Sequence, residues 1–389
     1  MPNRAPHPTY YLLNDPAGAR NIAYRRAAGR DCRVGRDANC HSTPDAYEWS
    51  PSNGSGRPPS SLTTAGRFTL ATMCAALAGR GIGKIAILGD SVAWSQFQSM
   101  WLLLGALEHG GPPPFRPSSV QLSVRCKAQR SATSYTATSN SNSIIELLYV
   151  RADSLNASIT ARTVSEADLT VLSAGAWYSP RHVRGVHGAA SAAVGSAGGG
   201  ASLGGAGHDG IAWLLFARHL LAVRDALTEA GLPNAAHRLV WRTSGVAHYA
   251  CDTHLKPHGD LSEALAHQLS GLLTCGTRCM ELGWHLHAAY DRTALDVLKP
   301  LGVLPLDVRP MSVLRPDAHS QRRFAERPRE PDCLHLALPG VVDWWNALLV
   351  AAVQTCGFND PGRPRLRLQG SQGSTRKSAG AAAQHQQRR

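Results

Sequence analysis

One serine and one aspartate–histidine pair are the side chains of this sequence whose types and order suggest chemistry. Ser91 ends the run Ile-Ala-Ile-Leu-Gly-Asp-Ser, and far downstream Asp332-Cys-Leu-His335 precedes an apolar stretch. A serine hydroxyl is a weak nucleophile until a base takes its proton and a third group orients that base. Together these residues are the parts of a serine nucleophile that forms an acyl-enzyme.

The elements around Ser91 favour this interpretation. Residues 84–88 form a continuous apolar run of strand length, and residues 92–107 have a helical pattern. Ser91 would then lie where a parallel strand ends and a helix begins, the edge at which such sheets bind ligands. A backbone N–H at that helix start can help to stabilise an oxyanion. Taken alone, Gly-Asp-Ser is better explained as a helix N-cap.

The spacing of Asp332 and His335 places both side chains on one side of a helical turn. The carboxylate could therefore hold the imidazole while the other ring nitrogen faces Ser91. Asp317 and His319 form a competing pair, but a separation of two residues suits one helical face less well.

Further strands and helices alternate along the chain. Expected strands are residues 144–149, 169–172 and 238–241, and expected helices are residues 68–77, 211–229 and 336–354. Alternating elements of these lengths predict a parallel central sheet with helices on both faces.

Composition divides the chain into three parts. Residues 1–67 are rich in Pro, Arg and Ser and predict a loop-rich arm, and residues 68–360 hold the α/β domain. Within that domain, residues 185–210 are nearly all Gly, Ala, Ser and His, which predicts a flexible surface insertion. Residues 361–389 predict a disordered basic tail.

The charge argues against a nucleic-acid partner. The net charge of +13 is concentrated at the two ends, because residues 1–36 contribute +5 and residues 361–389 contribute +7. A nucleic-acid reader needs a basic stripe on the folded body. We therefore expect no nucleic-acid partner, although a basic tail could dock on an acidic protein surface. The N-terminus lacks the apolar stretch of a signal peptide, and the longest apolar runs of the chain are too short for a transmembrane segment.

The nine cysteines are scattered singly except for Cys275 and Cys279. No second pair stands at zinc-finger spacing, so we expect no metal site. Buried thiols or a few disulfides explain the others. The tripeptides beginning at Asn53 and Asn156 are glycosylation sequons, which permit a secretory origin without requiring one.

The sequence around these residues resembles a known family. The segment Asp332-Cys-Leu-His-Leu-Ala-Leu-Pro-Gly-Val-Val-Asp-Trp-Trp-Asn346 is similar to the C-terminal motif of the trichome-birefringence-like, or PC-esterase, family of SGNH/GDSL proteins, Asp-Cys-x-His-Trp-Cys-Leu-Pro-Gly-x-x-Asp-x-Trp-Asn. Other matching segments follow in the same order: Tyr47-Glu-Trp-Ser-Pro51, Leu88-Gly-Asp-Ser-x-x-x-x-Gln96, Asp168-Leu-Thr-Val-Leu-Ser-Ala-Gly175, Trp241-Arg-Thr-Ser244, and Leu306-Asp-Val followed by Arg315-x-Asp-x-His319.

This resemblance implies an SGNH-like three-layer α/β/α sandwich that works through an acyl-enzyme. It makes Ser91 the nucleophile, His335 the general base and Asp332 its orienting partner, and it makes Gly175 an oxyanion donor. Most family members are Golgi O-acetyltransferases of cell-wall polysaccharides. We therefore expect a glycan acceptor, an acetyl donor such as acetyl-CoA, no bound cofactor, and the secretory pathway as the location.

Residues that the motifs leave without a catalytic role are candidates for other tasks. Trp94, beside the nucleophile, could stack on a sugar ring, and Arg315, Asp317 and His319 are either structural or substrate-facing.

The chain also departs from the family. Family members have Arg-Asn where this chain has Trp94-Ser95, and Ala337 replaces a motif cysteine, so the family's disulfide pattern cannot be complete. Loss of one oxyanion donor costs roughly 100- to 1000-fold in rate. Two alternatives therefore stay open, a catalytically degenerate protein that binds glycans and a protein that interacts through its basic tail.

Overall fold

The computed structural model describes most of the α/β domain and two short strands before it. The described residues are 10–14, 47–51, 70–104, 118–126, 143–183, 205–232, 238–249, 251, 258–319, 323–324, 327–336, 338 and 340–355. The predicted basic tail, the sequon at Asn53, most of the predicted N-terminal arm and most of the predicted insertion lie outside these residues. The predicted domain boundaries therefore stay predictions.

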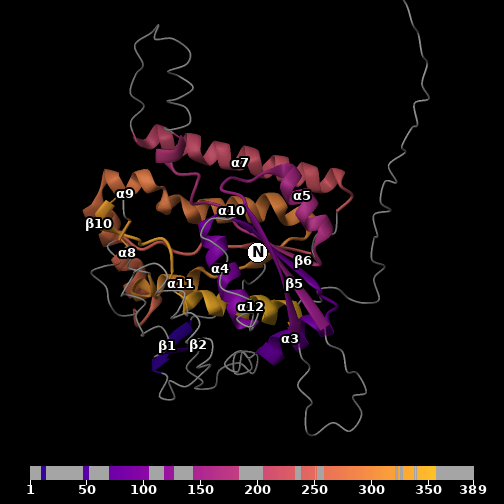
Figure 1. The fold of residues 1–389 in the computed structure, drawn as a ribbon. Helices are drawn as coiled ribbons and strands as arrows, with labels where there is room; N and C mark the ends of the chain where they lie inside the picture. Colours follow the sequence, from indigo (N-terminus) through magenta and orange to yellow (C-terminus); the bar gives the residue numbers. More distant parts are fainter. Residues whose placement is uncertain are drawn as a thin grey trace, which may run out of the picture.

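A six-stranded sheet forms the centre of the domain (Figure 1). Its strands, in spatial order, are β4 (Ser119–Cys126), β5 (Ser143–Arg151), β3 (Lys84–Gly89), β6 (Leu169–Leu172), β7 (Leu239–Arg242) and β8 (Leu304–Leu306). All neighbours pair in parallel except β4 and β5, which pair antiparallel. This order confirms the predicted α/β class with a mostly parallel sheet.

Helices cover both faces of the sheet. Figure 1 shows α7 and α10 on one side and α3 and α12 on the other. The helices are α3 (Leu70–Gly79), α4 (Ser91–Leu103), α5 (Ala157–Glu166), α7 (Gly205–Glu229), α8 (Leu261–Cys275), α9 (Thr277–Leu282), α10 (His287–Leu298), α11 (Arg309–Val313) and α12 (Val341–Thr355), with short 3₁₀ turns η5 (Trp284–Leu286), η6 (Lys299–Leu301) and η7 (Pro316–Ala318).

Two hydrophobic cores fill the space between the three layers. Ile85 and Ile87 of β3 point into the core shared with α3, α4 and α12, whereas Leu88 points into the core shared with α5, α7 and α10. This alternation follows from the period of two in a strand. Burial on both faces explains why residues 84–88 read as a continuous apolar run.

The starts of α4, α12 and α7 differ informatively from the sequence-based expectation. Helix α4 begins at Ser91 itself, and α12 begins at Val341, directly after Gly340. Proline disfavours a helical conformation in the residue before it, so Pro339 explains why the helix does not start at residue 336. Helix α7 begins at Gly205, so the end of the predicted insertion, residues 205–210, is helical rather than flexible loop.

One edge strand and two short antiparallel strand pairs were not predicted. They are β4 at the sheet edge, the pair β1 (Tyr10–Asn14) with β2 (Tyr47–Pro51), and the pair β9 (Arg323–Phe324) with β10 (Arg327–Pro331). In β4 the exposed residues Ser119, Gln121 and Ser123 alternate with partly buried Val120 and Leu122. An edge strand of this kind has a weak apolar signal, because only one of its faces meets the core.

The carboxyl ends of the parallel strands meet at one edge of the sheet, where Ser91 lies. The close approach of β3 and β6 at this edge requires a glycine. A Cβ atom on Gly89 would lie 2.5 Å from the Ser173 carbonyl oxygen and 2.8 Å from the Ala93 Cβ atom. A larger residue at position 89 would therefore push the turn that carries Ser91 away from the sheet.

Candidate active site

Ser91, His335 and Asp332 form a continuous chain of hydrogen bonds. The Ser91 Oγ atom lies 2.7 Å from His335 Nε2, and His335 Nδ1 lies 2.8 Å from Asp332 Oδ2 and 3.0 Å from Oδ1. With Nδ1 donating to the carboxylate, Nε2 is free to accept the serine proton. The geometry has the contacts that a nucleophile, a base and an orienting group require.

The segment that carries Asp332 and His335 is not a helical turn, contrary to the spacing argument. Its backbone is irregular, and Asp332 Oδ1 accepts hydrogen bonds from the backbone N–H groups of Leu334 at 3.2 Å and His335 at 3.1 Å. An aspartate side chain that caps its own turn in this way fixes the backbone locally. The same carboxylate thus shapes the turn and holds the imidazole.

The segment that contains His248 and Cys251 also holds this turn in place. The His248 N–H donates to the Cys333 carbonyl at 3.0 Å, and Cys333 forms a disulfide with Cys251. Residue 333 is therefore held through both its backbone and its side chain, directly beside Asp332. Although Ala337 replaces a motif cysteine, Cys333 still has a partner.

The charge balance of the pair favours an ionised Asp332. Burial by itself raises the pKa of Asp332, but the charge and hydrogen bonds of His335 outweigh burial and bring that pKa below its ordinary value. The carboxylate is only 5% exposed, so little solvent screens it from the imidazole. An ionised Asp332 can stabilise the imidazolium that forms when His335 takes a proton.

Asp90 shapes the nucleophile turn. Its Oδ1 atom accepts from the Val92 N–H at 2.8 Å, and the Tyr149 hydroxyl donates to the Asp90 carbonyl at 3.1 Å. Burial raises the pKa of Asp90, while the nearby Arg242 cation and the backbone N–H groups of Val92 and Ala93 oppose that rise. Asp90 therefore acts as the cap of α4, and Ser91 is the first residue of that helix.

Arg242 is a buried cation at the same edge of the sheet. Only 1% of Arg242 is exposed, its guanidinium donates to Ser173 Oγ, and its centre lies 4.7 Å from the ring of Trp345. Burial lowers the pKa of Arg242 to about 10, against the pull of Asp90 and Asp291. From the sequence, Arg242 was noted only as part of the motif Trp241–Ser244. Its burial could not be predicted, because it depends on the tertiary fold.

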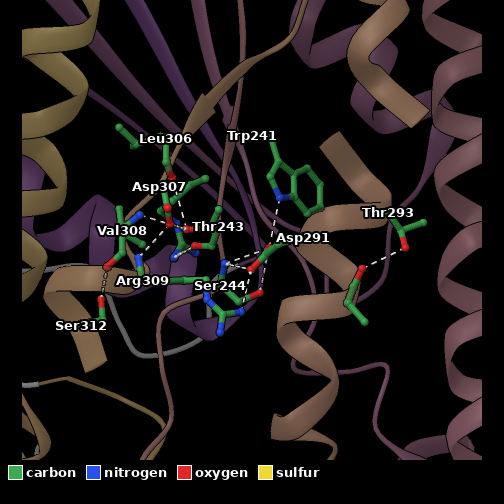
Figure 2. Close-up of polar contacts among 12 residues, drawn as sticks. Trp241, Thr243, Ser244, Asp291, Thr293, Leu306, Asp307, Val308, Arg309 and Ser312 are labelled. Atoms are coloured by element: carbon green, nitrogen blue, oxygen red, sulfur yellow. Dashed lines mark hydrogen bonds and ion pairs between the residues drawn. The ribbon is translucent and has the colours of Figure 1, made fainter. Parts of the chain in front are cut away.

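A polar cluster ties β7 to α10 and β8, as Figure 2 shows. Asp291 accepts from Trp241 Nε1 at 3.2 Å and from the Ser244 N–H at 3.0 Å, and Arg309 lies 3.6 Å away. Burial raises the pKa of Asp291 to about 6. Asp291 was missed from the sequence because it stands alone on a helix with no motif around it.

Gly175 lies in the loop after β6, at the edge of the sheet that carries Ser91. A Cβ atom at this position would lie 3.1 Å from Ser244 Oγ and 3.6 Å from His287 Cδ2. The backbone therefore passes close to Ser244, which follows β7, and to His287, the first residue of α10. Its role as an oxyanion donor stays a prediction.

Trp94 is a core residue, and the expectation that it faces a sugar is wrong. Its ring is 4% exposed, stacks on Phe97 with centroids 5.3 Å apart, and meets Tyr149 edge-on at 4.9 Å. The residue lies on the inward face of α4, so a ligand cannot reach its face. A tryptophan beside a nucleophile is thus explained by packing.

The side chains of Arg315, Asp317 and His319 are also buried, which supports the structural alternative. Arg315 donates to both Asp317 oxygens, at 2.8 and 2.9 Å. His319 is 3% exposed and contacts the His335 carbonyl at 3.0 Å. The competing Asp317–His319 pair does not form, because Asp317 is engaged by Arg315.

Two observations concern metals and membranes. Among the residues that the structure describes, no group of three or more His, Cys, Asp or Glu side chains is placed to hold a metal ion, and Cys275 and Cys279 form a disulfide. Within the same residues, the helices are too short or too polar to cross a bilayer.

Comparison with known proteins adds a family to this geometry. Residues 276–352 match the PC-Esterase model, described as a GDSL/SGNH-like acyl-esterase family found in Pmr5 and Cas1p. The matched segment contains Asp332 and His335 but not Ser91. No curated protein matches the chain.

Proposed function

The chain carries a segment of the PC-esterase family of GDSL/SGNH-like acyl esterases, and we propose that it is a serine-dependent O-acetyltransferase or acetylesterase of glycans. The observation that carries this proposal is the contact of 2.7 Å between Ser91 Oγ and His335 Nε2. It joins a residue outside the matched segment to the Asp332–His335 pair inside it.

The first half-reaction transfers an acetyl group to the serine. His335 Nε2 takes the Ser91 proton while Ser91 Oγ attacks the acetyl carbonyl carbon, which gives a tetrahedral oxyanion. When the intermediate collapses, the bond to the leaving group breaks and His335 returns the proton to that group. Asp332 keeps the transient imidazolium paired throughout.

The second half-reaction removes the acetyl group. A sugar hydroxyl, or water in an esterase, loses its proton to His335 and attacks the acetyl-serine carbonyl. Collapse of this second intermediate breaks the bond to Ser91 Oγ, which recovers its proton from His335. Transfer and hydrolysis thus differ only in which hydroxyl reaches the acyl-enzyme.

Backbone N–H groups are the oxyanion donors in this proposal. Ser91 is the first residue of α4, where N–H groups have no partner within the helix and the helix dipole favours negative charge. Gly175 follows the adjacent strand β6. With Trp94 in the core, these backbone groups take over what side chains near the nucleophile supply in the family.

The remaining parts of the proposal concern donor, acceptor and compartment. The family resemblance supports a polysaccharide hydroxyl as acceptor, acetyl-CoA or another activated acetyl ester as donor, and the Golgi as the location. The Cys251–Cys333 and Cys275–Cys279 disulfides support an oxidising compartment, because such bonds persist there.

The first prediction tests the nucleophile directly. We expect a fluorophosphonate probe to label the wild-type chain and to leave Ser91→Ala unlabelled, because only the His335-activated hydroxyl is nucleophilic enough. Asp225→Asn, a change at an exposed residue of α7, is the matched control and should label fully.

Equal labelling of wild type and Ser91→Ala would exclude Ser91 as the nucleophile. Acetylated xylan as substrate and a xylo-oligosaccharide with an acetyl donor then separate acetyl release from acetyl transfer. Glycan binding without either reaction, unchanged in Ser91→Ala, would favour the catalytically degenerate alternative instead.

A further inference from the structure

Two buried histidines form a contact pair next to the backbone of His335, the proposed base. His248 follows β7 and His319 follows η7, and neither is more than 3% exposed. His248 Nδ1 lies 2.7 Å from His319 Nε2. At the two ends of the pair, His248 Nε2 lies 2.9 Å from the Val313 carbonyl and His319 Nδ1 lies 3.0 Å from the His335 carbonyl.

The number of protons in this chain of contacts is restricted. A carbonyl oxygen only accepts, so each end contact needs a proton on the imidazole, and the contact between the rings needs a third. Two neutral imidazoles carry two protons. Burial lowers the pKa of His248 well below its ordinary value and lowers that of His319 to about 4. The pair is therefore neutral at pH 7, and one of the three contacts lacks its proton.

Lone-pair repulsion excludes one arrangement of the two protons. Two unprotonated nitrogens facing each other at 2.7 Å would repel, so the contact between the rings keeps a proton. The second proton then lies at one of the two ends of the pair. A proton on His319 Nδ1 allows this ring to donate to the His335 carbonyl, 3.0 Å away.

We propose that His319 is a positioning residue for the base His335, held in its working tautomer by His248. His319 Nδ1–H donates to the His335 carbonyl, and His248 Nδ1–H donates to His319 Nε2. This inference rests on the proposed function, because it gives His319 a task only if His335 is the base. It adds a third restraint on the turn, beside the Asp332 cap and the Cys333 disulfide.

The position of the His335 backbone matters because its imidazole must meet Ser91 Oγ at hydrogen-bond distance. Displacement of a catalytic group by about 1 Å can cost roughly 100-fold in rate. His319 also forms an isolated antiparallel bridge with Leu336, so the two segments already run side by side. Loss of the Nδ1 donor would free the carbonyl without removing the backbone bridge.

Two amide variants of His319 separate positioning from general support, which is the second prediction. The side-chain amide of Asn reaches the place of Nδ1, and that of Gln reaches the place of Nε2. We expect His319→Gln to lower kcat for acetyl-ester hydrolysis 10- to 100-fold with KM unchanged. His319→Asn should stay within a few-fold of wild type. Equal losses in both variants would overturn the positioning role.

A second measurement does not depend on activity. Nitrogen-15 NMR of histidine-labelled wild-type protein at pH 7.5 reports which ring nitrogens carry protons, with signals assigned by their loss in His248→Gln and His319→Gln. We expect both rings to be protonated on Nδ1 alone. An Nε2-protonated His319 would overturn the inference. A wild type with these tautomers but no labelling of Ser91 would instead refute the proposed function.

Discussion

At the scale of single residues, the site depends on carboxylates whose surroundings differ. Asp332 pairs with His335, and the imidazole charge and hydrogen bonds keep its pKa below the ordinary value despite burial. Asp291 has only partial charge compensation, with Arg309 3.6 Å away, and burial raises its pKa to about 6. The first carboxylate serves charge stabilisation, whereas the second costs folding free energy when it ionises.

The third prediction concerns the pH dependence of stability. Between pH 3.8, the ordinary value, and about 6, the folded protein keeps a proton on Asp291 that the unfolded chain has lost. The contribution of this group to the unfolding free energy therefore falls as the pH rises through that window.

Asp291→Asn removes this titration. Relative to wild type, the variant should gain roughly 2 to 3 kcal/mol of unfolding free energy between pH 4 and pH 7.5, because only the wild type loses stability over that range. Denaturant unfolding of both proteins at each pH measures the difference. A difference that does not change with pH would show that Asp291 ionises normally.

At the scale of elements, a buried polar network holds α4 against α12. Asn346 accepts from Gln96 Nε2 at 3.2 Å and donates to Ser99 Oγ at 2.9 Å. Ser99 donates to Asp343, whose other oxygen accepts the Gly340 N–H at 2.8 Å. The helix that starts with Ser91 is thereby fixed to the turn that follows His335.

The fourth prediction tests this network by stability. Asn346→Ala leaves the buried Gln96 side-chain amide without its acceptor and removes the donor to Ser99 Oγ, which keeps its own bond to Asp343. A buried polar group left unsatisfied costs about 1 to 3 kcal/mol, and truncation of the buried side chain adds to that cost. We expect the unfolding free energy to fall by roughly 2 to 4 kcal/mol. Asn156→Ala removes the exposed N-cap of α5 and should cost only about 1 kcal/mol. Similar losses in both variants would argue against the network.

Strands and helices could be predicted from the sequence where an element is buried on all sides. Strand β6 was predicted with its exact bounds, because all four of its residues are buried and leave an unbroken apolar signal. Helix α5 was missed, since its buried residues Thr160, Thr163 and Val164 give little apolar contrast. Its start is instead marked by Asn156, whose side chain accepts from the Ile159 N–H at 3.0 Å.

The site was predictable to a similar degree. Ser91, Asp332 and His335 carry motif spacing, and the structure brings them together. Trp94 could not be placed from sequence, because the inward and outward faces of α4 are decided by tertiary packing. The tasks of His248 and Asp291 likewise depend on contacts between segments that lie far apart in the chain.

At the scale of the whole molecule, the Cys251–Cys333 disulfide closes a loop of 82 residues around the carboxyl side of the domain. Constraint of a loop this long stabilises a fold by about 4 to 5 kcal/mol in the chain-entropy model. The Cys275–Cys279 disulfide closes only four residues and should contribute about 2 kcal/mol. The two bonds thus provide a matched comparison within one chain.

The fifth prediction uses that comparison. We expect the Cys251→Ser, Cys333→Ser double variant to lose several kcal/mol of unfolding free energy and most of its labelling at Ser91, since residue 333 adjoins Asp332. The Cys275→Ser, Cys279→Ser variant should lose less stability and keep its labelling. If the first pair lost stability but labelled at the wild-type rate, the disulfide would not support the catalytic turn.

The long separation between Ser91 and His335 also has a consequence for biosynthesis. The two residues stand 244 positions apart, so a ribosome adding about 5 to 20 residues per second needs roughly 10 to 50 seconds to pass from the serine to the histidine. During that interval the nascent chain exposes a serine without a base. The proposed activity would therefore switch on only after translation has passed the turn that carries His335, and fragments ending before it would stay inert toward acetyl esters.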